Sequence, residues 1–287
     1  MKRYITVVFV SFLCLNLKAQ ETTILNVVYD FSYTRDLADP SNPYKSEMIL
    51  SAGQSGSRYT TRDLFNRNSP AAIKLNKQRE AKESSGAAAN TTVAVGGPML
   101  TVSNAGTLIN EEIFISKTNG TVQTAGRIGF KNYHFSVPLP SINWKLGNEQ
   151  KMICGYNCQK AVGDFGGRTF EAWFVPDLPY SFGPWKLNGL PGLILSANDT
   201  KNEISFTCKE ITKNSDPEEL ITSYMNLGRS VEVKPKEYQR VAGMFASDPA
   251  AMVEAQISGT TVSVRNLDSP GDKSIKKITR YNPMELK

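Results

Sequence analysis

The sequence predicts a mainly β (α+β) fold, a curved antiparallel sheet or incomplete barrel that carries several helices. Three observations lead to this prediction. Many short segments alternate apolar and polar residues, the connections between them are short and rich in turn residues, and one segment is apolar on both faces. The chain has 287 residues, of which 40% are hydrophobic, so it can form a sizeable core. We expect a single β-rich domain over residues 20–287.

The first 19 residues have the features of a secretory signal peptide. A positive pair at residues 2–3 precedes an apolar run over residues 4–15, and Ala19 ends a short small-residue motif. The run is too short to span a bilayer comfortably, and no later segment offers a long uninterrupted apolar stretch. We expect cleavage after Ala19, no acylation of Cys14, no transmembrane segment in the mature chain, and export to the periplasm or cell envelope.

The first part of the mature chain combines strands with a helix. Residues 24–34 are rich in β-branched and aromatic residues and predict a long first strand. Residues 47–51 and 57–61, separated by a glycine-containing turn, predict a hairpin. Residues 62–83 carry helix formers, with an interruption before Pro70, which suits the first turn of a helix.

The middle of the chain predicts a flexible insertion followed by a run of strands. Residues 84–98 are low in complexity and nearly uncharged, which is typical of a flexible surface insertion. In the segment 168–175 both faces are apolar, so we expect Trp173 to be buried, with antiparallel neighbours on either side. The strands expected after the insertion are 112–117, 121–124, 127–137, 142–146, 150–154, 158–162, 168–175, 192–197 and 203–211.

From about residue 216 the sequence predicts a helical C-terminal part. Asp216 can cap a helix over residues 217–226, whose first turn is acidic. Two further helices are expected at 234–245 and 249–256, the second of them capped by Asp248.

The charge balance of the mature chain is ordinary. The formal net charge of +6 includes Lys2, Arg3 and Lys18, so removal of the signal peptide leaves 6 − 3 = +3. A short strand is expected at 261–265, and we interpret the basic run over 273–280 as a solvated strand or tail. No aromatic residues interleave with this run, so we expect no nucleic-acid partner.

Three cysteines remain after the expected processing, namely Cys154, Cys158 and Cys208. In an oxidising compartment they predict one disulfide and one free thiol, or an intermolecular bridge. If residues 155–157 form a three-residue hairpin loop, Cys154 faces Cys158. The sequence leaves all three pairings open.

The most informative segment is a loop over residues 179–195, in which three prolines and three glycines stand among aromatic and aliphatic residues. Because proline fixes φ and glycine reaches conformations that other residues do not, the loop has a specified backbone path. In one interpretation Tyr180, Phe182, Trp185 and Leu190 form an apolar lip that binds a ligand or partner. In the other, the loop folds over the open end of the sheet and closes the core.

This loop resembles the signature of the GLPGLI family, exported proteins of Bacteroidota-type bacteria without an established activity. An "I-x-G-Y-x-C-x-K-A" block, a "G-R-x-x-x-A-W" block and a closing Asn-Pro pair at residues 282–283 agree with the same family. The matching residues are Gly155, Tyr156, Cys158, Arg168, Trp173, Gly183, Pro184, Gly189, Leu190, Pro191, Gly192, Leu193 and Ile194. Cys154 and Cys208 depart from the pattern. Residues 153–177 also resemble the meander of lipoprotein-carrier-like folds, an unclosed barrel around a helix.

The sequence singles out no catalytic, metal or cofactor site. His134 is the only histidine and lies in an alternating segment, without a G-x-S-x-G or S-x-x-K motif elsewhere. A zinc site would need a second pair of ligands beyond Cys154 and Cys158. The glycine-rich residues 163–168 lack a following helix that could present amides to a phosphate.

Paired carboxylates remain conceivable near one strand, where Asp164, Glu171 and Asp177 flank the segment 168–175. Their spacing singles out no pair, and we interpret them as exposed rim residues.

We therefore expect an exported cell-envelope protein, most simply a non-enzymatic binder of an apolar ligand or of an envelope partner. Two alternatives stay open: a carboxylate-dependent hydrolase that acts near the loop, and a purely structural envelope component. An apolar cavity of several hundred cubic ångströms would favour ligand binding. Two close carboxylates with raised pKa values would favour hydrolysis, and a filled core would favour a structural role.

Overall fold

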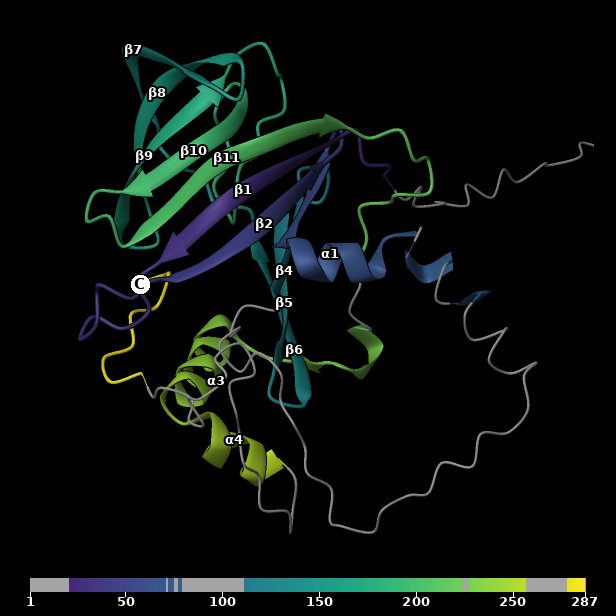
Figure 1. Cartoon of the computed structure of the whole chain (residues 1–287), viewed down its shortest axis with the longest axis vertical. Helices are drawn as coiled ribbons and strands as arrows, with labels where there is room; N and C mark the ends of the chain where they lie inside the picture. Colours follow the sequence, from purple (N-terminus) through teal and green to yellow (C-terminus); the bar gives the residue numbers. More distant parts are fainter. Residues whose placement is uncertain are drawn as a thin grey trace, which may run out of the picture.

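The computed structural model describes residues 21–70, 72–74, 77–78, 111–223, 227–256 and 278–286. Within them, a 12-stranded sheet curls into an unclosed half-barrel (Figure 1). The fold is mainly β, as the alternating segments predict. The expected signal peptide, the insertion at 84–98 and the strand at 261–265 lie outside the described residues.

The chain builds the sheet from two antiparallel meanders. The first meander consists of β1 (Leu25–Tyr33), β2 (Tyr44–Ala52), β3 (Gly56–Thr61), β4 (Glu111–Ser116), β5 (Thr121–Ile128) and β6 (Lys131–Pro138). The second consists of β7 (Lys145–Ile153), β8 (Tyr156–Phe165), β9 (Arg168–Val175), β10 (Leu193–Asp199) and β11 (Ile204–Lys213). They join where β1 pairs antiparallel with β11, and the short β12 (Val231–Glu232) adds a parallel edge beside β6.

The concave face of the sheet holds the main core. Alternate residues of β1, such as Val27, Tyr29 and Phe31, are buried there because successive side chains of a strand point to opposite faces. Phe31 stacks on Phe206 of β11 with ring centroids 5.0 Å apart. The alternating apolar residues that predict β1 are therefore the residues that face the core.

Helices lie beside the first meander (Figure 1). Helix α1 (Arg62–Asn68) begins after Thr61, whose side chain accepts a hydrogen bond from the Leu64 amide. Helix α3 (Pro235–Ser247) buries Tyr238, Val241 and Phe245 against β5 and β6. Helix α4 (Pro249–Gln256) is capped as expected, since the Ala251 amide donates to Asp248 Oδ1 at 3.1 Å.

Trp173 confirms the expectation of a strand covered on both faces. It is buried in β9, between antiparallel neighbours β8 and β10. The ammonium groups of Lys151 and Lys160 lie 4.1 and 5.8 Å from the centroid of its ring. Both ammonium groups thus lie over the indole ring, a contact that the negative face of the ring favours.

Three strand boundaries differ from the sequence-based expectation. The segment 127–137 is two strands, because Gly129 adopts a φ of +64° and reverses the chain. The segments 142–146 and 150–154 contribute to one strand, β7, whose register shifts between Leu146 and Gln150. The hairpin loop expected at 155–157 is instead a two-residue turn between β7 and β8.

The helix expected at 217–226 is absent from its described residues, 217–223. Asp216 does accept a hydrogen bond from the Glu218 amide, as a cap would. The next residues are held by tertiary contacts, because Leu220 bridges to Thr22 and the Asn26 side chain donates to Glu219. These long-range contacts override the local helical preference.

Candidate functional site

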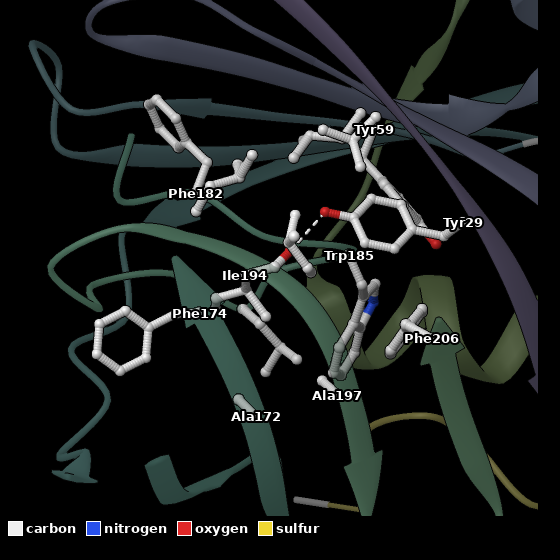
Figure 2. Packing of buried hydrophobic residues seen from close by; sticks show 14 of the residues in the cluster. Tyr29, Tyr59, Ala172, Phe174, Phe182, Trp185, Ile194, Ala197 and Phe206 are labelled. Atoms are coloured by element: carbon white, nitrogen blue, oxygen red, sulfur yellow. Dashed lines mark hydrogen bonds between the residues drawn. The ribbon is translucent and has the colours of Figure 1, made fainter. Parts of the chain in front are cut away.

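The loop between β9 and β10 folds inward onto the core. Phe182 forms an isolated bridge with Asn188, and the Ile194 amide donates to the Phe182 carbonyl at 3.0 Å. The Tyr29 hydroxyl donates to the Ile194 carbonyl at 2.6 Å (Figure 2). Because Ile194 lies in β10, these bonds connect the loop through the start of β10 to Tyr29 of β1.

The backbone requires a glycine at both glycine positions of the "LNGLPG" stretch. Gly189 has a φ of +89°, a region that side-chain-bearing residues rarely adopt. A Cβ on Gly192 would lie 2.1 Å from the carbonyl oxygen of Val175. The β9–β10 ladder therefore approaches Gly192 too closely for any side chain.

The four residues of the expected lip do not share one exposed surface. Phe182, Trp185 and Leu190 are buried, and Tyr180 is half-buried against the core. Figure 2 shows Phe182 and Trp185 among core residues rather than at the surface. Of the four, Trp185 borders the cavity described below.

The family-type motif residues lie in three places. Gly155, Tyr156 and Cys158 belong to the turn between β7 and β8 and to the start of β8. Trp173 lies in β9. The remaining residues lie in the loop and at the start of β10: Gly183, Pro184, Gly189, Leu190, Pro191, Gly192, Leu193 and Ile194.

Arg168 joins the "G-R" block to the closing Asn-Pro pair. Its guanidinium is buried and donates to Asp199 Oδ2, Glu203 Oε2 and Asn282 Oδ1, each at 2.7 Å. It also donates to the backbone carbonyl of Pro283 at 2.9 Å. Two motifs that are far apart in the sequence thus form one charge network, which holds the C-terminal segment against the sheet.

A cavity of about 80 Å³ opens between the concave face, α3 and residues 281–285. Its wall combines aromatic and charged side chains, so it is neither purely apolar nor purely polar. The aromatic residues are Tyr33, Phe135, Trp185, Tyr238 and Tyr281, and the charged residues are Arg35, Glu111, Lys186 and Glu285. A smaller void of about 10 Å³ adjoins it and shares Glu111, Trp185 and Met284 in its wall.

Trp185 reaches the cavity from a strained backbone. It has a φ of +57°, which is a genuine outlier for a bulky residue. Its ring packs edge-on against Phe165, with centroids 5.2 Å apart. Such strain persists only where surrounding contacts enforce it, and it is concentrated at functional sites. Here it directs Trp185 and Lys186 of one loop into the same cavity wall.

Three of the charged groups around the cavity, those of Lys186, Glu285 and Glu111, have partners in its wall. Lys186 forms an ion pair with Glu285, and its ammonium lies 5.3 Å from the Phe135 ring centroid. The Tyr238 hydroxyl donates a hydrogen bond to Glu111 Oε1 at 2.8 Å. Burial of the carboxyl raises the pKa of Glu111, although as a residue Glu111 is still partly exposed. A nearby Glu285 raises this pKa further, whereas Tyr238 and Lys186 oppose the shift.

Burial also raises the pKa of Tyr281 to about 12 and that of Tyr238 well above its usual range. Both phenols are therefore neutral donors at physiological pH. Thr124 Oγ1, in the same wall, has no hydrogen-bond partner among the described residues. The wall can thus bind a molecule that has an aromatic or aliphatic body and a hydrogen-bonding group.

The titratable residues that the sequence analysis considered as candidates do not line this cavity. His134 Nδ1 is hydrogen-bonded to Ser230 Oγ at 2.6 Å on β6. Asp164 accepts from Thr169, Glu171 pairs with Lys160, and Asp177 is exposed in a turn. These carboxylates form no common site.

The acidic residues of the cavity, Glu111 and Glu285, were not among the sequence-based candidates. A signal for Glu111 does exist in the sequence. Glu111 shares strand parity with Ile113 and Ile115, whose side chains are buried in the core. A carboxylate on the inward face of a strand indicates a polar site, whereas the neighbouring Glu112 faces the other side.

Two classes of feature are absent from the described part of the chain. No group of three or more histidine, cysteine or acidic residues there could hold a metal ion. No helix in the same residues is both long and apolar enough to cross a membrane.

Comparison with known proteins gives a short family match. Residues 166–196 match the model of a family described as "Protein of unknown function (Porph_ging)". The matched stretch contains β9, the inward loop and the start of β10, where the resemblance to the GLPGLI family is concentrated. No curated protein matches the chain.

Two solved structures of PNGF-II are similar to this chain at a low level. The structure in the P21 space group has a TM-score of 0.49 and 17% identity, and covers 77% of this chain and 33% of that chain. The structure in the C2 space group has a TM-score of 0.47 and 16% identity, and covers 77% and 32%. This chain therefore spans about a third of the length of the structures it matches, and we draw no functional conclusion from them.

Proposed function

We propose that this is an exported cell-envelope protein that binds a small ligand in the cavity beneath α3. The observation that carries the proposal is the cavity wall, in which aromatic rings surround the Glu111 carboxyl, whose pKa is raised by burial, and the Thr124 hydroxyl, which has no hydrogen-bond partner among the described residues. Ligand sites are typically apolar with a few polar groups that fix orientation. The apolar ligand expected from the sequence would then carry at least one hydrogen-bonding group.

The size of the cavity limits the ligand. A volume of about 80 Å³ would hold roughly five to eight water molecules. This is much less than a lipid chain or a drug-sized molecule requires. The cavity is also smaller and more polar than the apolar cavity of several hundred cubic ångströms that the sequence analysis associated with ligand binding, so the proposal is restricted to small molecules.

Helix α3 allows a matched pair of variants to test the binding proposal. Ala242 lines the cavity, and Ala242→Leu would fill part of it. Ser247 is exposed on the same helix, and Ser247→Leu adds an identical side chain away from the cavity. The protein and both variants would be purified from the native envelope, and mass spectrometry would identify the small molecules that they release.

We expect one small species to accompany the protein and Ser247→Leu in near-equal amounts and to be depleted at least tenfold in Ala242→Leu. Equal recovery from all three proteins, or no bound species in any of them, would contradict ligand binding at this site and favour an envelope partner or a structural role.

A second candidate, carboxylate-dependent hydrolysis, is supported by the raised pKa of Glu111 beside Glu285. A carboxyl that remains protonated at higher pH can act as a general acid. Turnover of chromogenic nitrophenyl esters and glycosides, present in the protein and lost in Glu111→Gln, would support it. Absence of turnover across the panel would leave binding as the role of the cavity.

Export is proposed from the pattern of the first 19 residues. Intact-mass analysis of protein secreted by its native host tests it separately. We expect a mature chain that begins at Gln20 without a lipid adduct. A retained N-terminus or an acylated Cys14 would refute the export proposal and would have no bearing on ligand binding in the cavity.

A further inference from the structure

Three thiols from two distant parts of the chain lie close together. Cys154 lies in the turn between β7 and β8, Cys158 in β8, and Cys208 in β11. Cys154 Sγ donates a hydrogen bond to the backbone carbonyl oxygen of Cys208 at 3.2 Å. We propose that Cys154 and Cys208 form a disulfide and that Cys158 remains a thiol.

The backbone at Cys154 supports a specific role for this cysteine. Cys154 and Gly155 have φ values of +47° and +82°, the combination that a two-residue turn between antiparallel strands requires. Asparagine, aspartate and glycine are the usual residues at the first of these positions, because other side chains are strained there. A disulfide would explain why a cysteine, rather than one of these usual residues, occupies this turn position.

Exposure separates the three thiols into one accessible group and two buried ones. Cys154 is exposed, whereas Cys158 and Cys208 are buried. Burial raises the pKa of Cys158 to about 11 and also raises that of Cys208. Because Cys154 alone of the three is exposed, it is the thiol that meets an oxidant first.

The position of the proposed bridge suggests its purpose. Strand β7 is the last strand of the sheet and is exposed along nearly its whole length. It is hydrogen-bonded to β8 alone among the described strands. A bond between Cys154 and Cys208, which are 54 residues apart, would fasten this edge hairpin to β11 near the centre of the sheet.

The chemistry requires a disulfide reagent, either a small one such as oxidised glutathione or that of a thiol–disulfide oxidoreductase. The Cys154 thiolate attacks the reagent, breaks its S–S bond and forms a mixed disulfide while one reagent thiolate leaves. The Cys208 thiolate then attacks Cys154 Sγ and releases the second reagent thiolate. The two protein thiols lose two electrons and two protons, which the reagent takes up as two thiols.

The pairing is tested on the full chain with oxidised glutathione, followed by alkylation of free thiols and peptide mapping. The test does not depend on export or on ligand binding, so its failure is distinguishable from theirs. Trypsin leaves Cys154 and Cys158 in one peptide, 152–160, but chymotrypsin cuts between them after Tyr156. Cys14 lies in a separate tryptic peptide, 4–18.

We expect a cross-linked pair of peptides that contain Cys154 and Cys208, with a mass about 2 Da below the sum of the reduced peptides. Cys158 is expected to be alkylated only after unfolding. A bridge between Cys154 and Cys158, a bridge between Cys158 and Cys208, or three alkylated thiols would each overturn the proposal.

Matched variants give a second readout. We expect oxidation to raise the melting temperature of the protein and of Cys158→Ala by about 5–10 °C. Cys154→Ser replaces an exposed turn residue, should fold, and should lose this increase. If Cys154→Ser retains the increase, or if the unaltered protein shows none, the proposed pair is wrong.

Discussion

Replacing Gly192 by alanine provides a quantitative test of the inward loop. The new Cβ would lie 2.1 Å from the carbonyl oxygen and 2.6 Å from the carbonyl carbon of Val175. Ordinary contact requires about 3.4 Å, so the β9 and β10 backbones must separate by roughly 1 Å at the Leu193–Val175 pair. Overpacking of this kind costs about 1–3 kcal/mol, and each weakened ladder hydrogen bond costs about 0.5–1.5 kcal/mol. We therefore expect Gly192→Ala to lower the free energy of unfolding by about 2–5 kcal/mol.

Alanine substitutions at two other glycines serve as comparisons for Gly192→Ala. Gly189 has a φ of +89° but an added Cβ would find its nearest neighbour 4.0 Å away, at Trp144 Nε1. Gly189→Ala therefore carries only the conformational penalty, about 1–2 kcal/mol. Gly147→Ala meets ordinary contacts at 3.5 Å and no positive φ, so we expect a change within about 0.5 kcal/mol.

Urea unfolding at 25 °C, followed by tryptophan fluorescence, measures all three variants. The expected order of destabilisation is Gly192→Ala, then Gly189→Ala, then Gly147→Ala. Equal midpoints for Gly192→Ala and Gly147→Ala would show that the close approach to Val175 is not present in solution. A larger loss for Gly189→Ala than for Gly192→Ala would show that conformational strain outweighs the steric clash.

Three further predictions follow from the core, the charge network and the cavity. Trp185→Ala should lower the free energy of unfolding by about 3–5 kcal/mol because a buried indole is lost; an unchanged urea midpoint would mean that the ring is exposed. Arg168→Met should cost about 3–5 kcal/mol by leaving the buried Asp199 carboxylate without its cation, and adding Asp199→Asn should recover part of the loss; no recovery would argue against this pairing. Because the folded-state pKa of Glu111 lies above its ordinary value of 4.5, its contribution to stability is full below pH 4.5 and is lost as pH rises through the raised pKa. Urea titrations from pH 4 to 8 should show this decline, and Glu111→Gln should flatten it; parallel pH profiles would contradict the burial of the carboxyl.

The strands were largely predictable from the sequence because most of them have one face in a single core. Trp173 illustrates the point, since apolar residues on both faces of its segment correctly indicated cover on both sides. Boundaries were less predictable where a glycine with positive φ reverses the chain, as at Gly129. Alternation of apolar residues can continue through such a turn, so the pattern alone gives one strand in place of two.

Long-range polar contacts were the least predictable features. The side chain of Asn26 reaches Glu219 across 193 residues, and this contact holds a segment that local propensity assigns to a helix. The cavity is also built from separate parts of the chain, with Glu111 from β4, Tyr238 from α3 and Glu285 near the end. Local patterns contain no information on which of these parts meet.

The pairing of β1 with β11 has a consequence for how the protein folds. Leu25 is paired with Lys213, and the Arg168 network is completed by Asn282, a further 114 residues along the chain from Arg168. A growing polypeptide that has already produced the first meander still exposes one unpaired edge of β1. Such an edge is a template for aggregation until its partner is made. Folding that depends on contacts of this sequence separation is slow, on the order of milliseconds to seconds, so the unfolded protein should depend on holdase chaperones until the residues up to Asn282 are available to pair.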